Sequence, residues 1–164
     1  WDVANTTRIR DLDAHLLYGL GTDDSHNYHN TAGSTPGRGW VMVRATELDA
    51  DALVEAIERG DFYASSGVVI DDISVNERSM TMDIAAQKDA TYVTEFIGTR
   101  RGSEEVGQVL ARVPGLRPSY HFRGDELFVR ATVTSTLPAD NPVFAGQKRQ
   151  AWVQPVVPAR LAEE

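Results

Sequence analysis

After Gly67 the sequence breaks into short segments rich in β-branched and aromatic residues, and none of them is long enough to supply repeated crossover helices. Two segments alternate strictly between apolar and polar side chains. The first places Met80, Met82 and Ile84 against Thr81 and Asp83, and the second places Leu127, Val129, Ala131 and Val133 against Arg130, Thr132 and Thr134. A period of two gives each strand one buried face. Because parallel strands need long crossovers, residues 67–164 are predicted to form an antiparallel β-sandwich.

The first 66 residues have a different pattern. Ile9, Leu12 and Leu16 follow helical spacing, which predicts a helix over residues 8–18. A strand is expected at "WVMVRA" (40–45), and a second helix at residues 49–59, between an Asp49 cap and Gly60. "DFYAS" (61–65) reads as another strand, and "EEVGQVLARV" (104–113) is allowed a helical turn. The predicted fold class is α+β, mainly β: an antiparallel β-sandwich with a short N-terminal helical and loop segment.

Composition restricts the function. Of the 164 residues, 41% are apolar and 24% charged, which is typical of a soluble globular protein. The formal net charge of −8 opposes binding to nucleic acid or to an anionic membrane through general electrostatic attraction. No apolar run approaches the roughly 20 residues that a membrane helix needs. The chain has no cysteine, which excludes disulfides, thiolate metal sites and cysteine nucleophiles.

The loop "GLGTDDSHNYHN" (19–30) contains the most suggestive chemistry. Asp24 and His26 are two residues apart, so in an extended segment both side chains would reach the same ion. Carboxylate oxygen and imidazole nitrogen suit Zn²⁺, Mn²⁺ or Fe²⁺. Two ligands are too few for a closed site, and others would have to come from elsewhere. The simpler alternative is that Asp23 and Asp24 cap a turn while His26 lies on the surface.

The order of several segments resembles the end of a PHP-family (polymerase and histidinol phosphatase) protein. The matching segments are "LLYGLGTDDSHNYH", "GRGWVMVRA", "LDADALVEAIERGDFYASSG" and "DELFVRATVTS", followed by "AWVQPVV". In that family a Gly-x-(Ser/Thr)-Asp-(Asp)-x-His segment ends the catalytic barrel, and some members continue into an accessory β-rich domain. The resemblance implies a metal-dependent hydrolase of the phosphoesterase type, with a divalent metal (Zn, Mn or Fe) as cofactor.

Carried over residue by residue, the resemblance makes Asp24 and His26 metal ligands. Asp23 is an extra acid that would support the site rather than bind directly, and His29, which has no secure counterpart, is an alternative ligand.

Three further residues could lie at the mouth of a substrate site, namely Arg38, Ser65 and Ser66. For the two serines a plain Ser-Ser-Gly turn is the favoured alternative, and for the arginine a solvated surface position is at least as good an explanation.

The chain also departs from the family pattern, because no His-x-His pair precedes residue 23 and only 22 residues precede the motif. Residues 1–66 are therefore interpreted as the C-terminal remnant of a PHP-like catalytic domain, left from a truncated α/β barrel, and residues 67–164 as an accessory β-sandwich domain. The absence of an initiator Met before Trp1 agrees with a fragment. Without the other ligands, the chain alone is expected to be inactive and to need no metal.

An alternative from a different class is a non-catalytic β-sandwich module for binding or assembly. Five aromatic residues are spaced as core residues, which favours a scaffold over a ligand platform: Trp40, Trp152, Tyr92, Tyr120 and Phe128. Loss of the barrel would expose apolar surface near the first helix and "WVMV", so a homo-oligomer is expected. The substrate of the parent could be a nucleotide, a sugar phosphate or another compound.

Overall fold

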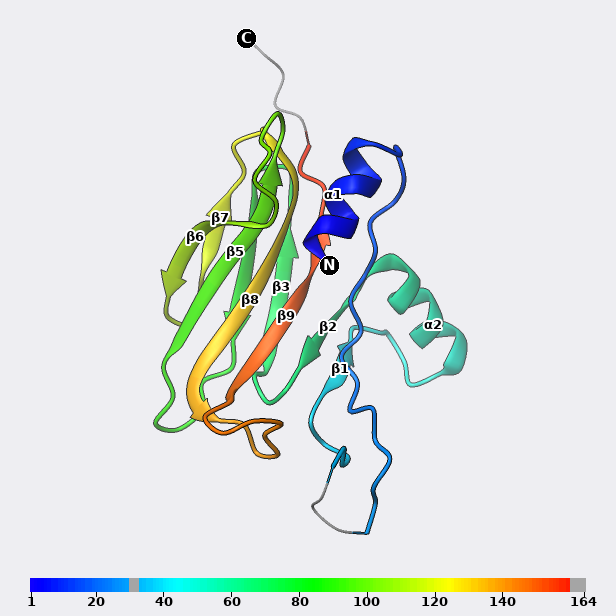
Figure 1. Cartoon of the computed structure of the whole chain (residues 1–164), viewed down its shortest axis with the longest axis vertical. Coiled ribbons are helices and arrows are strands. Elements are labelled where there is room, and N and C mark those ends of the chain that lie inside the picture. The colour runs from blue at the N-terminus through cyan, green and yellow to red at the C-terminus, as the bar shows by residue number, and fades with distance from the viewer. Residues whose placement is uncertain (30–32, 160–164) are drawn as a thin grey trace.

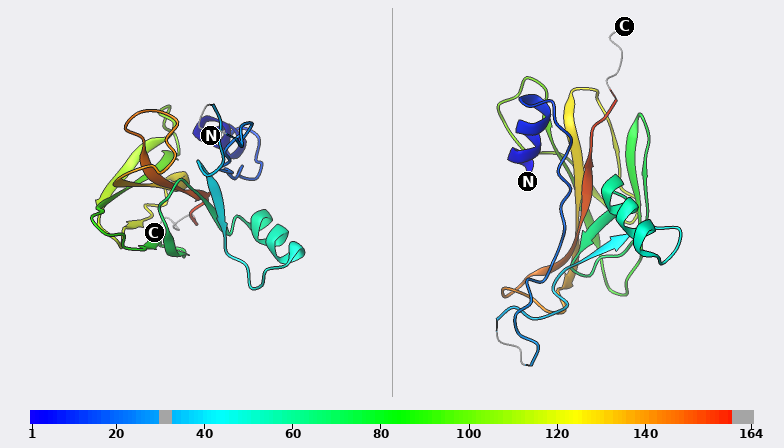
Figure 2. Two further views of the ribbon diagram at one scale, coloured as in Figure 1. Left: turned by 90° about the horizontal axis from the view of Figure 1, so that it is seen from below. Right: turned by 90° about the vertical axis from the view of Figure 1, so that its right-hand side faces the viewer.

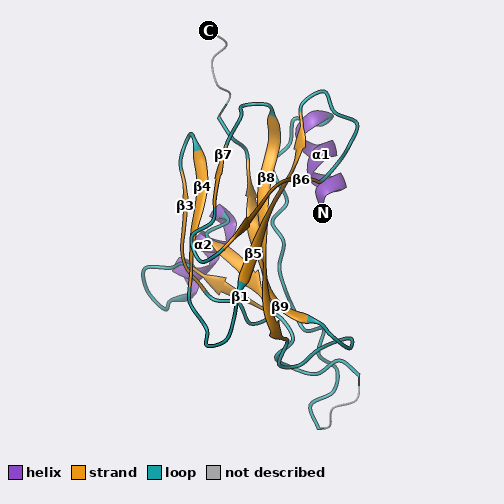
Figure 3. Cartoon of the chain, turned by 90° about the vertical axis from the view of Figure 1, so that its left-hand side faces the viewer, coloured by secondary structure: helices purple, strands orange, loops and turns teal. Residues whose placement is uncertain are grey.

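The chain folds into two antiparallel sheets packed face to face, with one helix on the outer face of the larger sheet and one beside its edge (Figures 1 and 3). The computed structural model describes residues 1–29 and 33–159. The predicted fold class, mainly β with antiparallel pairing, is confirmed. No helix in these two ranges is long and apolar enough to cross a membrane.

The larger sheet has six strands in the order β1-β2-β9-β8-β5-β6, and the smaller has three in the order β3-β4-β7. The strands of the larger sheet are β1 (Trp40–Val43), β2 (Phe62–Ser65), β9 (Lys148–Val156), β8 (Glu126–Pro138), β5 (Tyr92–Arg100) and β6 (Gln108–Pro114). Those of the smaller are β3 (Ile70–Val75), β4 (Ser79–Ile84) and β7 (Ser119–His121). The helices are α1 (Asp2–Arg10) and α2 (Ala50–Arg59). Every strand pair is antiparallel.

The core lies between the sheets and is made by the alternating residues. Met80, Met82 and Ile84 of β4 face Val129, Ala131 and Val133 of β8, and all six are buried. Tyr92, Phe96 and Tyr120 fill the space between them, with the rings of Phe96 and Tyr120 stacked at 5.4 Å. The predicted core role is therefore confirmed for Tyr92 and Tyr120, whereas Trp40 is 37% exposed.

Helix α2 forms where its end signals predict. The Asp49 carboxylate accepts hydrogen bonds from the backbone N–H groups of Asp51 and Ala52, both at 3.1 Å. Gly60 ends the helix in the left-handed conformation, at a φ of 79°. A side chain there would also collide with the ring of Tyr18, because an added Cβ would lie 2.6 Å from Tyr18 Cζ.

The helix predicted over residues 8–18 is wrong in position, since α1 ends at Arg10 and residues 14–27 have no regular secondary structure. Asp13 adopts a positive φ of 47°, which does not continue a right-handed helix. The backbone groups of Leu17 bind the side chain of Asn5 instead of helical neighbours. The face of α1 that meets the sheet consists of the polar residues Asn5 and Thr6, so hydrophobic spacing could not reveal it.

The helical turn allowed near residues 104–113 is also wrong, because Gln108–Pro114 form strand β6, paired with β5. The predicted boundary at residue 66 stays a prediction about origin. In the folded chain β2, on one side of that boundary, is hydrogen-bonded to β9, on the other side.

Strand β5 carries two buried threonines with opposite surroundings. Thr94 lies on the core face, is fully buried, and its Oγ1 has no hydrogen-bond partner among the described residues. Thr99 lies on the outer face, where its Oγ1 contacts Thr6 Oγ1 at 2.8 Å and accepts from the Gly107 N–H at 3.1 Å. A buried hydroxyl without a partner costs free energy, whereas a bonded one stabilises.

Thr94→Val is therefore expected to raise the free energy of unfolding by about 1 kcal/mol, because it removes an unsatisfied hydroxyl and keeps the shape of the side chain. Thr99→Val, the same exchange on the same strand, is expected to lower the free energy of unfolding by about 1–2 kcal/mol. Urea denaturation followed by circular dichroism measures both values. Two changes of the same sign would contradict this account of the two faces of β5.

Candidate functional site

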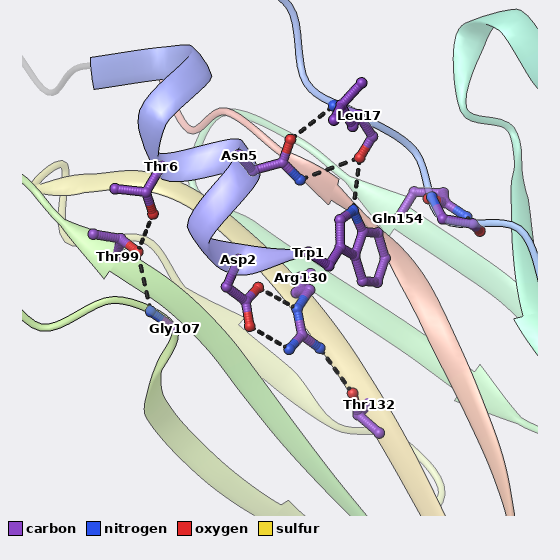
Figure 4. Close-up of polar contacts among 11 residues, drawn as sticks. Trp1, Asp2, Asn5, Thr6, Leu17, Thr99, Gly107, Arg130, Thr132 and Gln154 are labelled. Atoms are coloured by element: carbon purple, nitrogen blue, oxygen red, sulfur yellow. Dashed lines mark hydrogen bonds and ion pairs between the residues drawn. The ribbon is translucent and has the colours of Figure 1, made fainter. Parts of the chain in front are cut away.

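Two side-chain amides on the outer face of the larger sheet fix the segment that leads into the loop containing Asp23, Asp24 and His26, here called the acidic loop. Asn5 is fully buried; its amide group donates to the Leu17 carbonyl at 3.1 Å and accepts from the Leu17 N–H at 2.7 Å. Gly19, two residues after Leu17, is held in the same way by the side-chain amide of Gln154, which is 4% exposed. This amide accepts from the Gly19 N–H at 2.8 Å and donates to the Gly19 carbonyl at 2.9 Å. Figure 4 shows these residues beside α1. The two amides replace a strand partner for residues 17–19.

Helix α1 is held to the same face by charge. The Arg130 guanidinium forms a bidentate pair with the Asp2 carboxylate at 2.6 and 2.7 Å, and lies over the ring of Trp1, 5.2 Å from its centroid. These two side chains are 12% and 21% exposed, so solvent screens the pair less than it would at the surface. The Trp1 indole N–H also donates to the Leu17 carbonyl at 2.7 Å. Trp1 thus connects the start of α1 directly to the extended segment at Leu17.

The extended segment then crosses the outer face of the β1–β2 strand pair. Tyr18 meets Phe62 edge to face at 6.2 Å, and a Cβ added to Gly21 would lie only 2.9 Å from Ala64 Cβ. Gly21 is therefore the residue at which the backbone can pass this close to the sheet. Beyond it the chain leaves the sheet as the loop that Figures 1 and 2 show extending past β1.

Asp23 organises the return of this loop. Its carboxylate accepts hydrogen bonds from three consecutive backbone N–H groups, those of Gly37, Arg38 and Gly39, at 2.5–2.8 Å. Burial raises the pKa of Asp23, but the backbone donors lower it by more, so that the net pKa lies below the ordinary value. The carboxylate is thus fully engaged within the protein and has the contacts of a turn-forming group.

The two residues matched to metal ligands lie next to each other but are exposed. The side chains of Asp24 and His26 are 85% and 77% exposed, and the Asp24 carboxylate lies 3.8 Å from His26 Nδ1. The same nitrogen lies 2.6 Å from the Asp24 carbonyl oxygen and must donate to it, because a carbonyl only accepts. This tautomer leaves Nε2 with a lone pair that points away from the backbone. Asp24 itself has a positive φ of 50°.

Asp24 and His26 supply too few donor groups for a metal centre. Within residues 1–29 and 33–159, no group of three or more His, Asp or Glu side chains is close enough to hold an ion. Catalytic zinc sites use three protein ligands and structural sites use four. Asp24 and His26 together do not fit a complete metal site, and no catalytic step can be derived from them alone. His29 lies nearby on the chain, where its N–H contacts Asn27 Oδ1 at 3.4 Å.

The three residues considered for a substrate mouth, Ser65, Ser66 and Arg38, do not form a site together with Asp24 and His26. Ser65 and Ser66 are buried at 1% and 5% exposure, and their hydroxyls bind the backbone: Ser65 donates to the Val68 carbonyl at 2.7 Å, and Ser66 accepts from the Gln150 N–H at 2.9 Å. These are the contacts of the plain turn that the sequence also allowed. Arg38 is half-buried, and its Nε has no hydrogen-bond partner among the described residues.

The sequence did not single out Glu126, which is 1% exposed. Its carboxylate accepts from the Tyr120 hydroxyl at 2.6 Å and from the N–H groups of Arg123 and Gly124 at 3.0 Å each. Burial and this carboxylate raise the pKa of Tyr120 to about 12. Because each oxygen of Glu126 has a donor, the residue fastens the β7–β8 turn. A turn motif, "RGDE", is its only signal in the sequence.

A cavity of about 530 Å³ opens between the sheets where β1 and β2 extend past the smaller sheet. Its walls include Met42, Phe62, Tyr63, Ile73 and Met80, and Arg44 stands at its rim. The Arg44 guanidinium contacts the Asp72 carboxylate at 2.5 Å and the Ile73 carbonyl at 3.2 Å, both on β3. This arginine therefore bridges the two sheets rather than reaching toward the acidic loop.

Comparison of the chain with known protein families, with characterised proteins and with solved structures finds no match.

Asp23→Asn is expected to speed amide hydrogen exchange at Gly37 and Gly39 by about tenfold at neutral pH, because it weakens the acceptor of both N–H groups. Asp24→Asn is the matched control and should leave these amides unchanged. NMR-detected exchange measures both. Equal effects of the two substitutions would contradict the assignment of Asp23 as the organiser of the loop.

The same contacts predict a pH dependence. Since the folded pKa of Asp23 lies below the unfolded value, the carboxylate stabilises the loop fully at pH values above the unfolded pKa. The stabilisation is lost as the pH falls through the lowered, folded pKa. The amide chemical shifts of Gly37 and Gly39 should therefore hold through the ordinary carboxylate range and change only below it. Shifts that change at higher pH would contradict the prediction.

Proposed function

We propose that this chain is the C-terminal part of a PHP-like metal-dependent hydrolase of the phosphoesterase type, and that this part alone is not catalytic. The observation that carries the proposal is the pairing of Asp24 and His26 at the tip of an anchored loop. His26 donates through Nδ1 to a backbone carbonyl, which is how protein histidines are commonly oriented when Nε2 binds a metal. The resemblance of the ordered series of segments to PHP-family proteins is the reason for proposing that family.

The surroundings of the pair support a role as contributed ligands. Both side chains are exposed, so they could reach groups outside the described residues. The backbone on either side is fixed, by Gln154 at Gly19 and by Asp23 at Gly37–Gly39. A divalent metal, when bound to a complete ligand set, would activate a water molecule and offset charge on a phosphate. The contribution of this chain would be to hold two ligands in position.

The proposal predicts that the purified chain, supplied with Zn²⁺ or Mn²⁺, does not hydrolyse p-nitrophenyl phosphate above the rate of metal in buffer. His26→Ala should give the same rate, because there is no activity to lose. Phosphate release under initial-rate conditions is the measurement. Turnover that His26→Ala abolishes would overturn the statement that this part is inactive.

Weak metal binding is expected to remain. Asp24→Ala should weaken zinc binding by about tenfold or more, since it removes one of two neighbouring ligands. Glu77→Ala, which removes an exposed acid from the β3–β4 turn, is the matched control. Isothermal titration with zinc measures both. Unchanged binding in both Asp24→Ala and His26→Ala would count against the loop as a source of ligands.

A second candidate is a non-catalytic β-sandwich module for binding or assembly, and the cavity beside Met42 favours it. A volume of about 530 Å³ lies within the roughly 300–1,000 Å³ range of small-molecule sites. Of the five aromatic residues considered for a surface platform, Tyr92, Tyr120 and Phe128 are buried, while Trp152 is half-buried and Trp40 is 37% exposed. The module would therefore bind through the cavity or through the edge of the larger sheet.

A further inference from the structure

The two sheets have four edge strands, β1, β6, β3 and β7. All except β1 carry features that discourage pairing with a further strand. Unpaired strand edges attract other strands unless charges, bulges, proline or short length prevent it. Strand β7 has only three residues, and β6 contains Arg112 and ends at Pro114. Strand β3 begins with a bulge, carries Asp71 and Asp72, and has its Ile73 carbonyl covered by Arg44.

Strand β1 is also short, at four residues, but it has none of the other features. It reads Trp-Val-Met-Val, without charge or proline, and its register with β2 runs from Trp40↔Ser65 to Val43↔Phe62 without a bulge. Among the described residues it pairs with β2 alone. No other described strand is hydrogen-bonded to its opposite edge, although Thr22 of the N-terminal segment approaches this edge at Gly39.

The pairing pattern identifies the groups on this open edge. The Arg44 N–H donates to the Asp61 carbonyl at 2.8 Å, so Arg44 points its backbone groups toward β2. By alternation Met42 and Trp40 do the same, and Val41 and Val43 point theirs away. The Gly39 N–H, which has the outward parity, is bound by Asp23. Asp23 thus closes one end of the edge and leaves the groups of Val41 and Val43 open.

The side chains beside this edge are apolar and exposed. Trp40 and Met42 are 37% and 38% exposed, and Met42 lies opposite Tyr63, on the face that lines the cavity. A strand added at β1 would cover both side chains while it bonded the free backbone groups. The open edge and the exposed apolar side chains therefore favour the same occupant, an uncharged extended strand.

We propose that this occupant is β1 of a second copy of the chain, paired antiparallel about a two-fold axis at Met42. A two-fold axis normal to the sheet brings identical strands together in antiparallel orientation, so one uncharged strand satisfies both copies. In an antiparallel pair, residues directly opposite each other point their side chains to the same face of the sheet. The two-fold axis must therefore pass through a residue and not between two residues. Centring on Val41 would put Arg44 opposite Arg38 of the second copy, and like charges repel there. Centring on Met42 puts Arg44 opposite Trp40 instead.

In this register Val41 and Val43 of each copy exchange backbone hydrogen bonds with Val43 and Val41 of the other. The two Met42 residues form a non-hydrogen-bonded pair, in which Cα atoms lie about 4.5 Å apart. The shared ladder is only four residues long, and each chain carries a net charge of −8. The dimer is therefore weak and reversible, and it strengthens with added salt as screening reduces the repulsion. It does not depend on metal.

Sedimentation velocity tests the dimer. The weight-average mass of the wild-type chain should rise with concentration from the monomer toward the dimer. Val41→Pro removes an N–H from the open edge and leaves the bonds to β2, so it should abolish this rise while circular dichroism stays unchanged. Val41→Ala, which keeps the N–H, is the control and should associate like the wild type. A wild-type chain that stays monomeric, or a folded Val41→Pro chain that still dimerises, would overturn the proposal.

A crosslinking experiment tests the register, and it holds even if Val41→Pro fails to fold. The chain has no cysteine, so Met42→Cys introduces a single exposed thiol. The expected Cα separation lies within the range that a disulfide spans. Mild oxidation should give a covalent dimer that reducing agent reverses. Val54→Cys, a more accessible site on α2 at 55% exposure, should nevertheless crosslink far more slowly. Equal rates for the two variants would overturn the two-fold axis at Met42.

Discussion

Two buried side-chain amides, those of Asn5 and Gln154, determine where the segment up to Gly19 lies on the larger sheet. Each amide satisfies the N–H and C=O of one residue in an extended segment, Leu17 and Gly19. Without these amides the segment would have to place unpaired backbone groups against the sheet, which is costly. The Asp2–Arg130 pair supplies the remaining constraint, since it fixes the helix that carries Asn5. The position of the acidic loop follows from these contacts.

The parts of the fold that local patterns determine could be predicted from the sequence. Strands β4 and β8 have one apolar face each, and the alternation of Met80 with Thr81 or of Val129 with Arg130 marks it directly. Helix α2 has an N-cap and a C-terminal glycine, both local signals. Local patterns favour the same structure that the tertiary contacts stabilise, so these elements form where expected.

The errors occur where distant contacts override local pattern. Helix α1 buries Asn5 and Thr6 against a polar face of the sheet, and hydrophobic spacing does not register such a contact. Leu12, which supported the expected helix, is 63% exposed. The candidate site likewise has one part that local sequence indicates and another part that depends on distant contacts. The sequence indicated Asp24 and His26, which are neighbours along the chain, but the three N–H groups on Asp23 come from 14–16 residues away.

In the proposed function, the loop would present two metal ligands and the sandwich would hold the loop in place. The proposed function requires Asp24 and His26 to be ligands of an incomplete site, and cobalt spectroscopy tests this requirement most directly. Co²⁺ bound by only two protein groups keeps most of its water and absorbs weakly in the visible range, whereas a closed tetrahedral site absorbs strongly. The predicted result is a weak band, shifted from that of aqueous Co²⁺, which returns to the aqueous spectrum in His26→Ala. Strong tetrahedral bands from this chain, or a spectrum identical in His26→Ala, would contradict the proposal.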